Sequence, residues 1–200
     1  MALHALAKQS GIHVPEAMLM RFSGKHHTFL SKRFDRTEDA KRIHFASAMT
    51  LLGYKDDADY TEGVSYLELA GFIIQRSPSA TKDLEQLWRR IVFNILVSNT
   101  DDHLRNHGFL LSNIGWRLSP AYDINPNEYG TGLKLNITDT NNELNVELAL
   151  DVAKYFKLNP EKANSIKNEI ITVLKNWKTV AKSTGISNSE IEMTKNAFRI

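Results

Sequence analysis

A dense run of polar side chains lies between two apolar stretches near the middle of the chain. From Ser98 to His107 the sequence reads Ser-Asn-Thr-Asp-Asp-His-Leu-Arg-Asn-His. Carboxylate and amide oxygens in such a run can orient a hydroxyl group and hold a hard cation such as Mg²⁺. Phosphoryl transfer needs this kind of positioning and charge neutralisation more than covalent help from the protein.

The spacing within and after this run matches the protein-kinase catalytic loop. There a base aspartate precedes a metal-binding asparagine by five residues, and a hairpin then leads to a second metal-binding aspartate. Asp101, Asn106 and Asp123 reproduce that order. The pattern departs at three points: Thr100 replaces the usual arginine, His103 replaces the usual lysine, and Ile124-Asn125 follows Asp123.

The same residues resemble the HipA-type serine/threonine kinases, which are toxins of bacterial toxin–antitoxin pairs. The resemblance spans about the whole chain and is most specific at residues 98–123. It is carried by Asn99–Asn106 and Leu118–Asp123, and upstream by Leu6–Lys8, Gly11–Ala17 and Lys32–Arg36.

This resemblance implies a role for each candidate residue and a set of cofactors. Asp101 is then the catalytic base, His103 touches the transferred phosphate, and Asn106 and Asp123 bind magnesium. The implied nucleotide contacts are Lys32 and Phe34 at the hinge beside adenine, Asp35 near the ribose, and Tyr122. ATP and Mg²⁺ are the implied cofactors, and a protein serine or threonine is the implied acceptor. A helix-turn-helix antitoxin that itself binds DNA is the implied partner.

One part of the kinase pattern is missing. No glycine-rich phosphate loop precedes Asp101, and family members carry that loop and a strand lysine ahead of the first helix. Because the lysine clamps the nucleotide phosphates, we expect a truncated protein or one completed by a separately encoded N-terminal half.

Other interpretations of the polar run remain open. Asp101 and Asn106 could form a helix-ending Asx turn, and His103 and His107 could be hydrogen-bonding or solvated histidines. The chain could be a catalytically inactive kinase-like binding module. A third alternative is a metal-dependent phosphohydrolase that uses Asp101, Asp102, His103, His107 and Asp123 around transition metals.

The flanking sequence predicts an α+β, mostly helical protein: the C-terminal lobe of a protein-kinase-like fold with a small N-terminal β-hairpin remnant. Residues 1–36 are expected to form the remnant of the smaller lobe and the hinge, and residues 37–200 the helical lobe. A helix ends before Gly11, and strands at Ala17–Phe22 and Thr28–Arg33 flank a turn at Ser23–Lys25.

The lobe itself is predicted mainly from helical periodicity. Ser65 and Glu68 have capping-box spacing ahead of the helix Leu67–Ile74. Residues Asp83–Val97 carry an apolar stripe so wide that the helix must be largely buried. A hairpin at Gly108–Leu118 follows, then helices at Val146–Phe156, Pro160–Ser183 and Ser189–Phe198. The stretch Ile43–Leu52 is mixed, Lys55–Gly63 is read as an exposed loop, and Trp177 is expected to be half-buried.

Composition narrows the class of protein. The net charge is +2 over 200 residues, which is too diffuse for a surface that binds nucleic acid directly. There is no cysteine, so disulfide and cysteine–zinc chemistry are excluded. No signal layout or long apolar run is present, so a cytoplasmic protein without membrane contact is expected.

Overall fold

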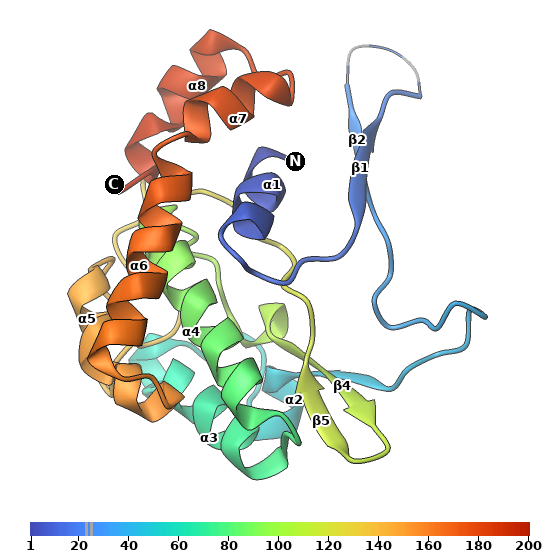
Figure 1. Cartoon of the computed structure of the whole chain (residues 1–200), viewed down its shortest axis with the longest axis vertical. Coiled ribbons are helices and arrows are strands. Elements are labelled where there is room, and N and C mark those ends of the chain that lie inside the picture. Colours follow the sequence, from blue (N-terminus) through green and yellow to red (C-terminus); the bar gives the residue numbers. More distant parts are fainter. Residues whose placement is uncertain (23, 25) are drawn as a thin grey trace.

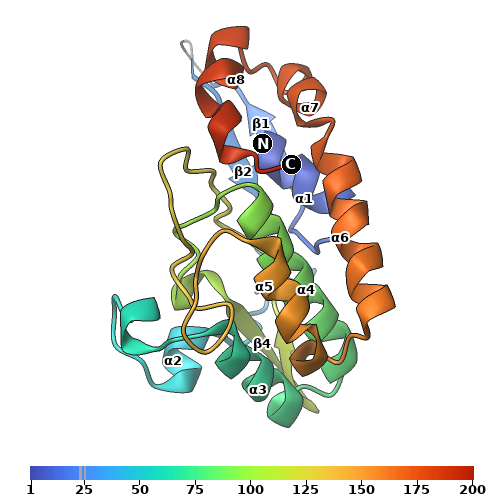
Figure 2. The same ribbon diagram turned by 90° about the vertical axis from the view of Figure 1, so that its left-hand side faces the viewer.

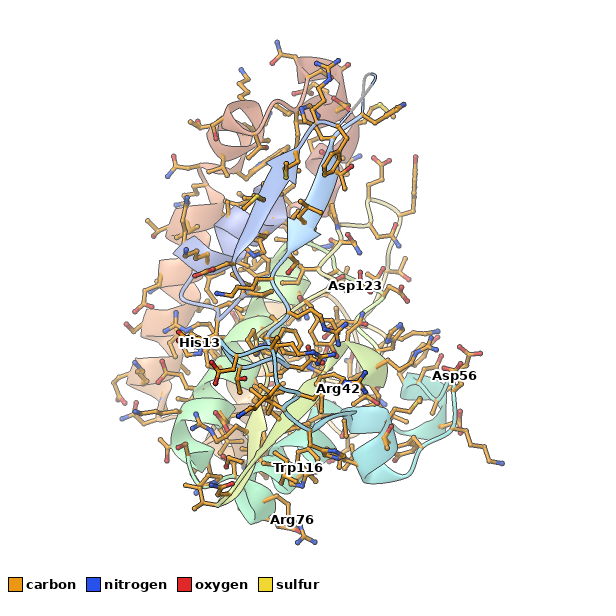
Figure 3. All side chains as sticks on the ribbon, turned by 90° about the vertical axis from the view of Figure 1, so that its right-hand side faces the viewer. His13, Arg42, Asp56, Arg76, Trp116 and Asp123 are labelled. Carbon is orange, nitrogen blue, oxygen red and sulfur yellow. The ribbon has the colours of Figure 1, made fainter. Side chains whose placement is uncertain are left out.

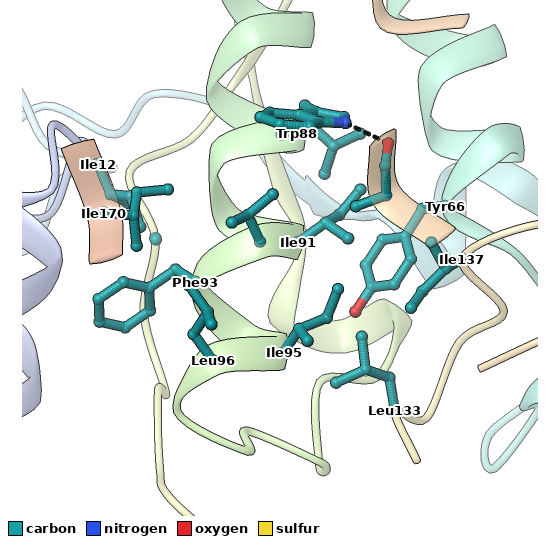
Figure 4. Close-up of a cluster of buried hydrophobic side chains, with 14 of the residues drawn as sticks. Ile12, Tyr66, Trp88, Ile91, Phe93, Ile95, Leu96, Leu133, Ile137 and Ile170 are labelled. Atoms are coloured by element: carbon teal, nitrogen blue, oxygen red, sulfur yellow. Dashed lines mark hydrogen bonds between the residues drawn. The ribbon is translucent and has the colours of Figure 1, made fainter. Parts of the chain in front are cut away.

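The computed structural model describes residues 1–22, 24 and 26–200, and its centre is the helix α4 (Ala80–Leu96). Side chains all around this helix are buried, including Trp88, Ile91, Phe93 and Ile95 at 0% exposure (Figure 4). The indole of Trp88 donates a hydrogen bond to Ala149 O at 2.9 Å, which satisfies its one polar atom inside the core. The buried helix predicted from the wide apolar stripe is therefore confirmed.

Helix α1 (Ala2–Gln9) belongs to the same core, through Leu6 and Ala7. Beyond it, β1 (Ala17–Met20) pairs antiparallel with β2 (Thr28–Ser31), with Met18 opposite Leu30. The predicted N-terminal hairpin is thus confirmed, while Ser23 and Lys25 of its expected turn lie outside the described residues. The hairpin stands to one side of the helical body (Figure 1).

A three-stranded antiparallel sheet lies at one end of α4. Its order is β3 (Phe45–Ser47), β4 (Gly108–Ser112) and β5 (Gly115–Leu118). The mixed stretch Ile43–Leu52 therefore divides into β3 and the short helix α2 (Ala48–Leu52), which ends at Gly53 with φ of 78°. The β4–β5 hairpin was predicted, whereas the pairing of β3 with β4 was not.

Helix α3 (Tyr66–Arg76) packs between this sheet and α4. Its capping box is present, and Ser65 N donates to Glu68 Oε2 at 3.2 Å as the sequence predicted. The segment before it, expected to be an exposed loop, contains a 3₁₀ turn at Tyr60–Glu62 and the buried Ala58.

The remaining helices follow β5 in the chain. They are α5 (Val146–Val152), the 3₁₀ turn Ala153–Phe156, α6 (Pro160–Leu174), α7 (Trp177–Ser183), α8 (Asn188–Thr194) and the 3₁₀ turn Lys195–Ala197. Of these, α5 and α6 pack against α4, whereas α7 packs against α1 and α8 against α7, beyond the end of α4 (Figure 2). The single helix predicted over Pro160–Ser183 is wrong, because the chain breaks at Lys175–Asn176. Trp177 is 5% exposed and stacks on Phe198, so the expectation that it is half-buried is also wrong.

The fold is α+β and mostly helical, as predicted. Within the part of the chain that the structure describes, we find no helix with the length and apolar character needed to cross a membrane.

Candidate active site

The polar run begins where α4 ends and is held by a left-handed residue. Ser98 is fully buried and has φ of 51°, so the chain turns sharply out of the helix. Residues 99–103 then form an irregular loop, and a 3₁₀ turn at Leu104–Asn106 leads into β4. The apolar elements on both sides thus fix the two ends of the loop.

Asp102 anchors this loop to the protein core. It is 4% exposed, and its Oδ2 accepts hydrogen bonds from Tyr66 OH (2.6 Å), Asn94 Nδ2 (2.7 Å) and His107 Nε2 (2.9 Å). The donors come from α3, from α4 and from the residue before β4. A buried carboxylate is tolerated when its oxygens are hydrogen-bonded in this way. We call these four side chains the Asp102 cluster.

The electrostatics of the cluster favour a charged Asp102. Burial alone would raise the pKa of Asp102. The electrostatic interaction and hydrogen bond with His107, the hydrogen bond from Tyr66 and the charge of Arg90 together outweigh burial, so the pKa is lowered. Burial, strengthened by the neighbouring Asp102, raises the pKa of Tyr66 well above its ordinary value. Tyr66 therefore stays protonated and keeps donating to the carboxylate.

Arg90 links α4 to the strand end that leads to Asp123. It is 3% exposed, and its Nη2 donates to Ser119 O. Burial lowers the pKa of Arg90 to about 10, with Asp102 acting in the opposite direction, so it remains a cation at neutral pH. The loop and the end of β5 are thus both tied to α4.

Asp101 and Asn106 are joined by one hydrogen bond. Asn106 Nδ2 donates to Asp101 O at 3.0 Å. This bond orients the Asn106 amide and leaves its Oδ1 as the atom that can bind a cation. The Asp101 side chain is exposed, whereas Asn106 is 6% exposed.

Asp123 occupies a left-handed conformation with φ of 55°. Aspartate tolerates this region better than most residues. Its side chain is exposed, and Oδ1 accepts a hydrogen bond from Asn125 Nδ2 at 2.8 Å. Asp123 lies on the face of the molecule that also carries the β1–β2 hairpin (Figure 3).

Tyr122 connects Asp123 to the loop. Its hydroxyl donates to Arg105 O at 2.6 Å, and its ring stacks on Phe34 with centroids 5.6 Å apart. Burial raises the pKa of Tyr122, so the hydroxyl remains a donor. Tyr122 lines two neighbouring cavities, one of which also includes Asn106 and Asp102, and the other Asp123.

The larger of these two cavities is about 420 Å³ and lies between α1, the β1–β2 hairpin and residues 121–125. His4, Pro15 and Phe29 form the wall opposite Tyr122 and Asp123. His4 Nε2 donates to Pro15 O at 2.7 Å, and its ring meets Phe29 edge-on. Sequence reasoning gave no role to His4 or Phe29, and no local motif distinguishes them.

Of the eight predicted site residues, Tyr122 and Asp123 line this cavity, whereas Asp101, Asn106, Phe34, Lys32, Asp35 and His103 do not. Lys32 pairs with Glu16 at 3.4 Å in solvent, and Asp35 is held by Arg33 (2.5 Å) and Arg36 (2.6 Å). The hydrogen bond from Arg33 lowers the pKa of Asp35 despite partial desolvation. His103 lines a separate small cavity with Asp56 and Lys134. Their roles at a nucleotide stay predictions.

The oxygen donors suit magnesium better than a transition metal. Asn106 Oδ1 and the Asp123 carboxylate are hard ligands, and Mg²⁺ is commonly held by only one or two protein oxygens with water and phosphate oxygens. Among residues 1–22, 24 and 26–200, no group of three or more His, Cys, Asp and Glu side chains could hold a metal ion. His107 instead serves Asp102 inside the core, as a hydrogen-bonding histidine.

Comparison with solved structures first defines the class of fold. HipA of Shewanella oneidensis, solved with HipB and operator DNA, has a TM-score of 0.81 at 19% identity, over 98% of this chain and 52% of that one. The Helicobacter pylori kinase CtkA has a TM-score of 0.56 at 15% identity, over 96% of this chain and 86% of that one. The fold is therefore kinase-like.

Sequence comparison then defines the family. Residues 1–177 match the HipA-like C-terminal domain, and the chain belongs to this family. A candidate kinase of Haemophilus influenzae is 33% identical over 128 residues, which are 59% of this chain and 37% of that protein. The serine/threonine-protein kinase toxin HipA of Shewanella oneidensis is 28% identical over 138 residues, 60% of this chain and 31% of that protein. The chain thus spans about a third of the length of either of these relatives.

Proposed function

We propose that this chain is the catalytic-loop lobe of a Mg-ATP-dependent protein serine/threonine kinase of the HipA type. The observation that carries the proposal is the pairing of an exposed Asp101 with a buried, oriented Asn106 in a loop anchored on the Asp102 cluster. A loop built only as a connector has no need of three buried hydrogen bonds behind one carboxylate.

In this proposal each side chain performs one task. Asp101 accepts a hydrogen bond from the acceptor serine or threonine hydroxyl and receives its proton. Asn106 Oδ1 and Asp123 hold Mg²⁺, and the cavity beside Tyr122 takes the nucleotide. When bound, ATP would supply the phosphoryl group and leave as ADP, and Mg²⁺ would neutralise the charge on the phosphates. His103 contacting the phosphate, and Lys32, Phe34 and Asp35 contacting the adenosine, remain part of the proposal.

The β1–β2 hairpin supports the view that a further segment completes the pocket. Met18, Phe22 and Phe29 are 57%, 67% and 46% exposed, and each strand pairs only with the other among the described residues. An isolated two-stranded hairpin is marginally stable, and exposed apolar groups together with open edges suit the addition of further strands. We infer that the completing segment carries the glycine-rich loop and the lysine.

The proposal is tested by measuring ATP binding and phosphate transfer. The chain is titrated with ATP and Mg²⁺ by calorimetry, alone and together with the N-terminal half of a relative. Transfer of labelled phosphate to protein is then followed for both preparations. We expect Asp101→Asn and Asp123→Asn to abolish transfer, and the exposed Asp139→Asn to leave it unchanged. Absence of Mg-ATP binding by the completed assembly contradicts the proposal.

A second candidate function is a kinase-like binding module without catalysis. This alternative is favoured by the ion pairs of Asp35 with Arg33 and Arg36. Both arginines bind the carboxylate that was expected to contact the ribose of the nucleotide. The completed assembly distinguishes the two functions. A binding module transfers no phosphate, whether or not it binds the nucleotide.

The proposed biological setting is a toxin–antitoxin pair in the cytoplasm. The structure of the Shewanella HipA was solved with HipB and operator DNA. By analogy, we propose that this chain acts on a protein substrate and meets DNA only through a helix-turn-helix antitoxin. Co-purification of the chain with the product of an adjacent gene tests this association.

A further inference from the structure

The last residues of the chain reach back to the start of the catalytic loop. Arg199 N donates to Leu96 O at 2.8 Å, Arg199 Nε donates to Ser98 Oγ at 2.9 Å, and Nη2 donates to Gly130 O at 3.1 Å. One residue therefore bonds the end of α4, the left-handed Ser98 and a loop more than thirty residues further along. The three acceptors lie within the family match, which covers residues 1–177, whereas Arg199 lies outside it.

Ser98 is a position that needs such support. Serine seldom adopts φ near 51°, and a strained backbone persists only when its surroundings fix it. Ser98 O accepts hydrogen bonds from Thr100 N and Asn127 N, both at 2.9 Å. The hydrogen bond from Arg199 Nε to Ser98 Oγ restrains the side chain of Ser98 as well.

Gly130 carries the restraint to the residue before Asp101. An added Cβ at Gly130 would lie 2.3 Å from Thr100 Cγ2, so the loop backbone is packed directly on Thr100. Asn127 Nδ2 also donates to Thr100 Oγ1 at 2.8 Å. Because Arg199 bonds Gly130 O, it helps to hold the backbone at Gly130 against Thr100, the residue before the proposed base Asp101.

Aromatic stacking holds the terminal segment in place. The rings of Phe198 and Trp177 are nearly parallel, 4.0 Å apart and inclined by 7°. Ile191 and Ala197 are the buried apolar residues of the segment Ser187–Arg199. A mostly apolar cavity of about 280 Å³ is lined by residues of α1, α7 and α8 and by Phe198. The terminal segment is therefore attached both by this stacking and by the Arg199 hydrogen bonds.

We propose that Arg199 is a positioning residue: it fixes Ser98 and Thr100 through Ser98 Oγ and Gly130 O, and thereby sets the place of Asp101. This inference rests on the proposed kinase function, because it assigns Asp101 a task that requires accurate placement. Small misplacements of a reacting group reduce the rate of the chemical step strongly.

Hydrogen exchange of the isolated chain tests the restraint directly. We compare Arg199→Ala with Arg199→Lys, and use Lys195→Ala as the matched control, because the Lys195 ammonium bonds Glu192 on the same segment (3.0 Å). In Arg199→Ala we expect the amides of residues 98–101 to exchange roughly tenfold faster or more, while those of α3 are unchanged. Arg199→Lys should restore part of the protection, since lysine can reach one acceptor but lacks the fork of donors. Unchanged exchange in Arg199→Ala overturns the inference.

Kinetics of the completed assembly give the second readout. Arg199→Ala should lower kcat roughly 10- to 100-fold with little change in the KM for ATP, because the cavity beside Tyr122 is untouched. Phe198→Ala, which loosens the segment without removing the guanidinium, should lower kcat in the same direction. An unchanged kcat in Arg199→Ala contradicts the positioning role. If the unmodified assembly transfers no phosphate, the proposed function fails, and the exchange experiment still decides whether Arg199 restrains the loop.

Discussion

The loop of residues 98–107 and the β1–β2 hairpin are stabilised very differently. The loop rests on the Asp102 cluster, where a buried carboxylate is matched by three donors. The hairpin exposes Met18, Phe22 and Phe29, and all of β2 is exposed. One side of the candidate site is thus built by this chain's own core, and the other is left without apolar backing.

The two regions are expected to affect different properties: the loop affects the stability of the lobe, and the hairpin affects ligand or partner binding. The geometry of Asp101 and Asn106 depends on buried polar contacts, whose removal leaves unpaired groups. The hairpin contributes little to the core but forms one wall of the 420 Å³ cavity. Damage to the first region should unfold the lobe, whereas damage to the second should affect binding and leave the fold intact.

The largest expected effect is at Asp102. Asp102→Ala leaves Tyr66, Asn94 and His107 without their acceptor, and we expect it to lower the free energy of unfolding by about 3–5 kcal/mol. Urea denaturation followed by circular dichroism measures this change. Asp101→Ala is the matched control, because its side chain is exposed and should change stability by no more than about 0.5 kcal/mol. Equal losses in both variants would show that the cluster is not the anchor.

The same residue predicts an acid dependence. The pKa of Asp102 is lower in the folded protein than its ordinary value of 3.8, so its charged form stabilises the fold above that value. This contribution is lost as the pH falls through the lowered pKa. Asp102→Asn should therefore lose less stability than the unmodified chain when denaturation is repeated from pH 5 downward. Parallel curves for the two proteins would argue against a charged Asp102.

A smaller effect is expected from the backbone of Asp123. A β-branched residue at φ of 55° is strained, so Asp123→Val should be less stable than Asp123→Gly by about 1–2 kcal/mol. Both variants remove the carboxylate and should lose phosphate transfer equally. Thermal denaturation of the pair separates the conformational role of this position from its chemical role.

The smallest effect on stability is expected at the hairpin. Phe22→Ser and Met18→Ser should change the free energy of unfolding by less than about 0.5 kcal/mol, because both side chains are already exposed. Phe93→Ala in α4 should cost about 3–5 kcal/mol in the same assay. If a completing half binds the hairpin, the two serine variants should instead weaken its binding, measured by calorimetry. Strong destabilisation by either serine variant would show that the hairpin belongs to the core.

Elements with strong local signals were predicted correctly from the sequence. The buried stripe of α4, the capping box before α3 and the two hairpins depend on neighbouring residues, and the structure has all of them. The pairing of β3 with β4 was missed because Phe45–Ser47 is three residues long and its partner is about sixty residues away. The break at Lys175–Asn176 was missed because no glycine or proline marks it.

The candidate site shows the same limit. The spacing of Asp101, Asn106 and Asp123 is visible in the sequence, and their roles remain a prediction. The Asp102 cluster could not be predicted as a unit, because its donors come from α3, from α4 and from the residue before β4. Trp177 likewise looked half-exposed on a lysine-rich helix, since its partner Phe198 lies on another element.

The hairpin also gives the molecule a chemical sensitivity that its core lacks. Met18 and Met20 are 57% and 39% exposed, and the chain contains no cysteine to react first. Oxidation to the sulfoxide makes a methionine polar, and dedicated reductases reverse it. Oxidants would therefore convert Met18 and Met20 to the sulfoxide readily, and the modification would make an exposed apolar face of the hairpin polar.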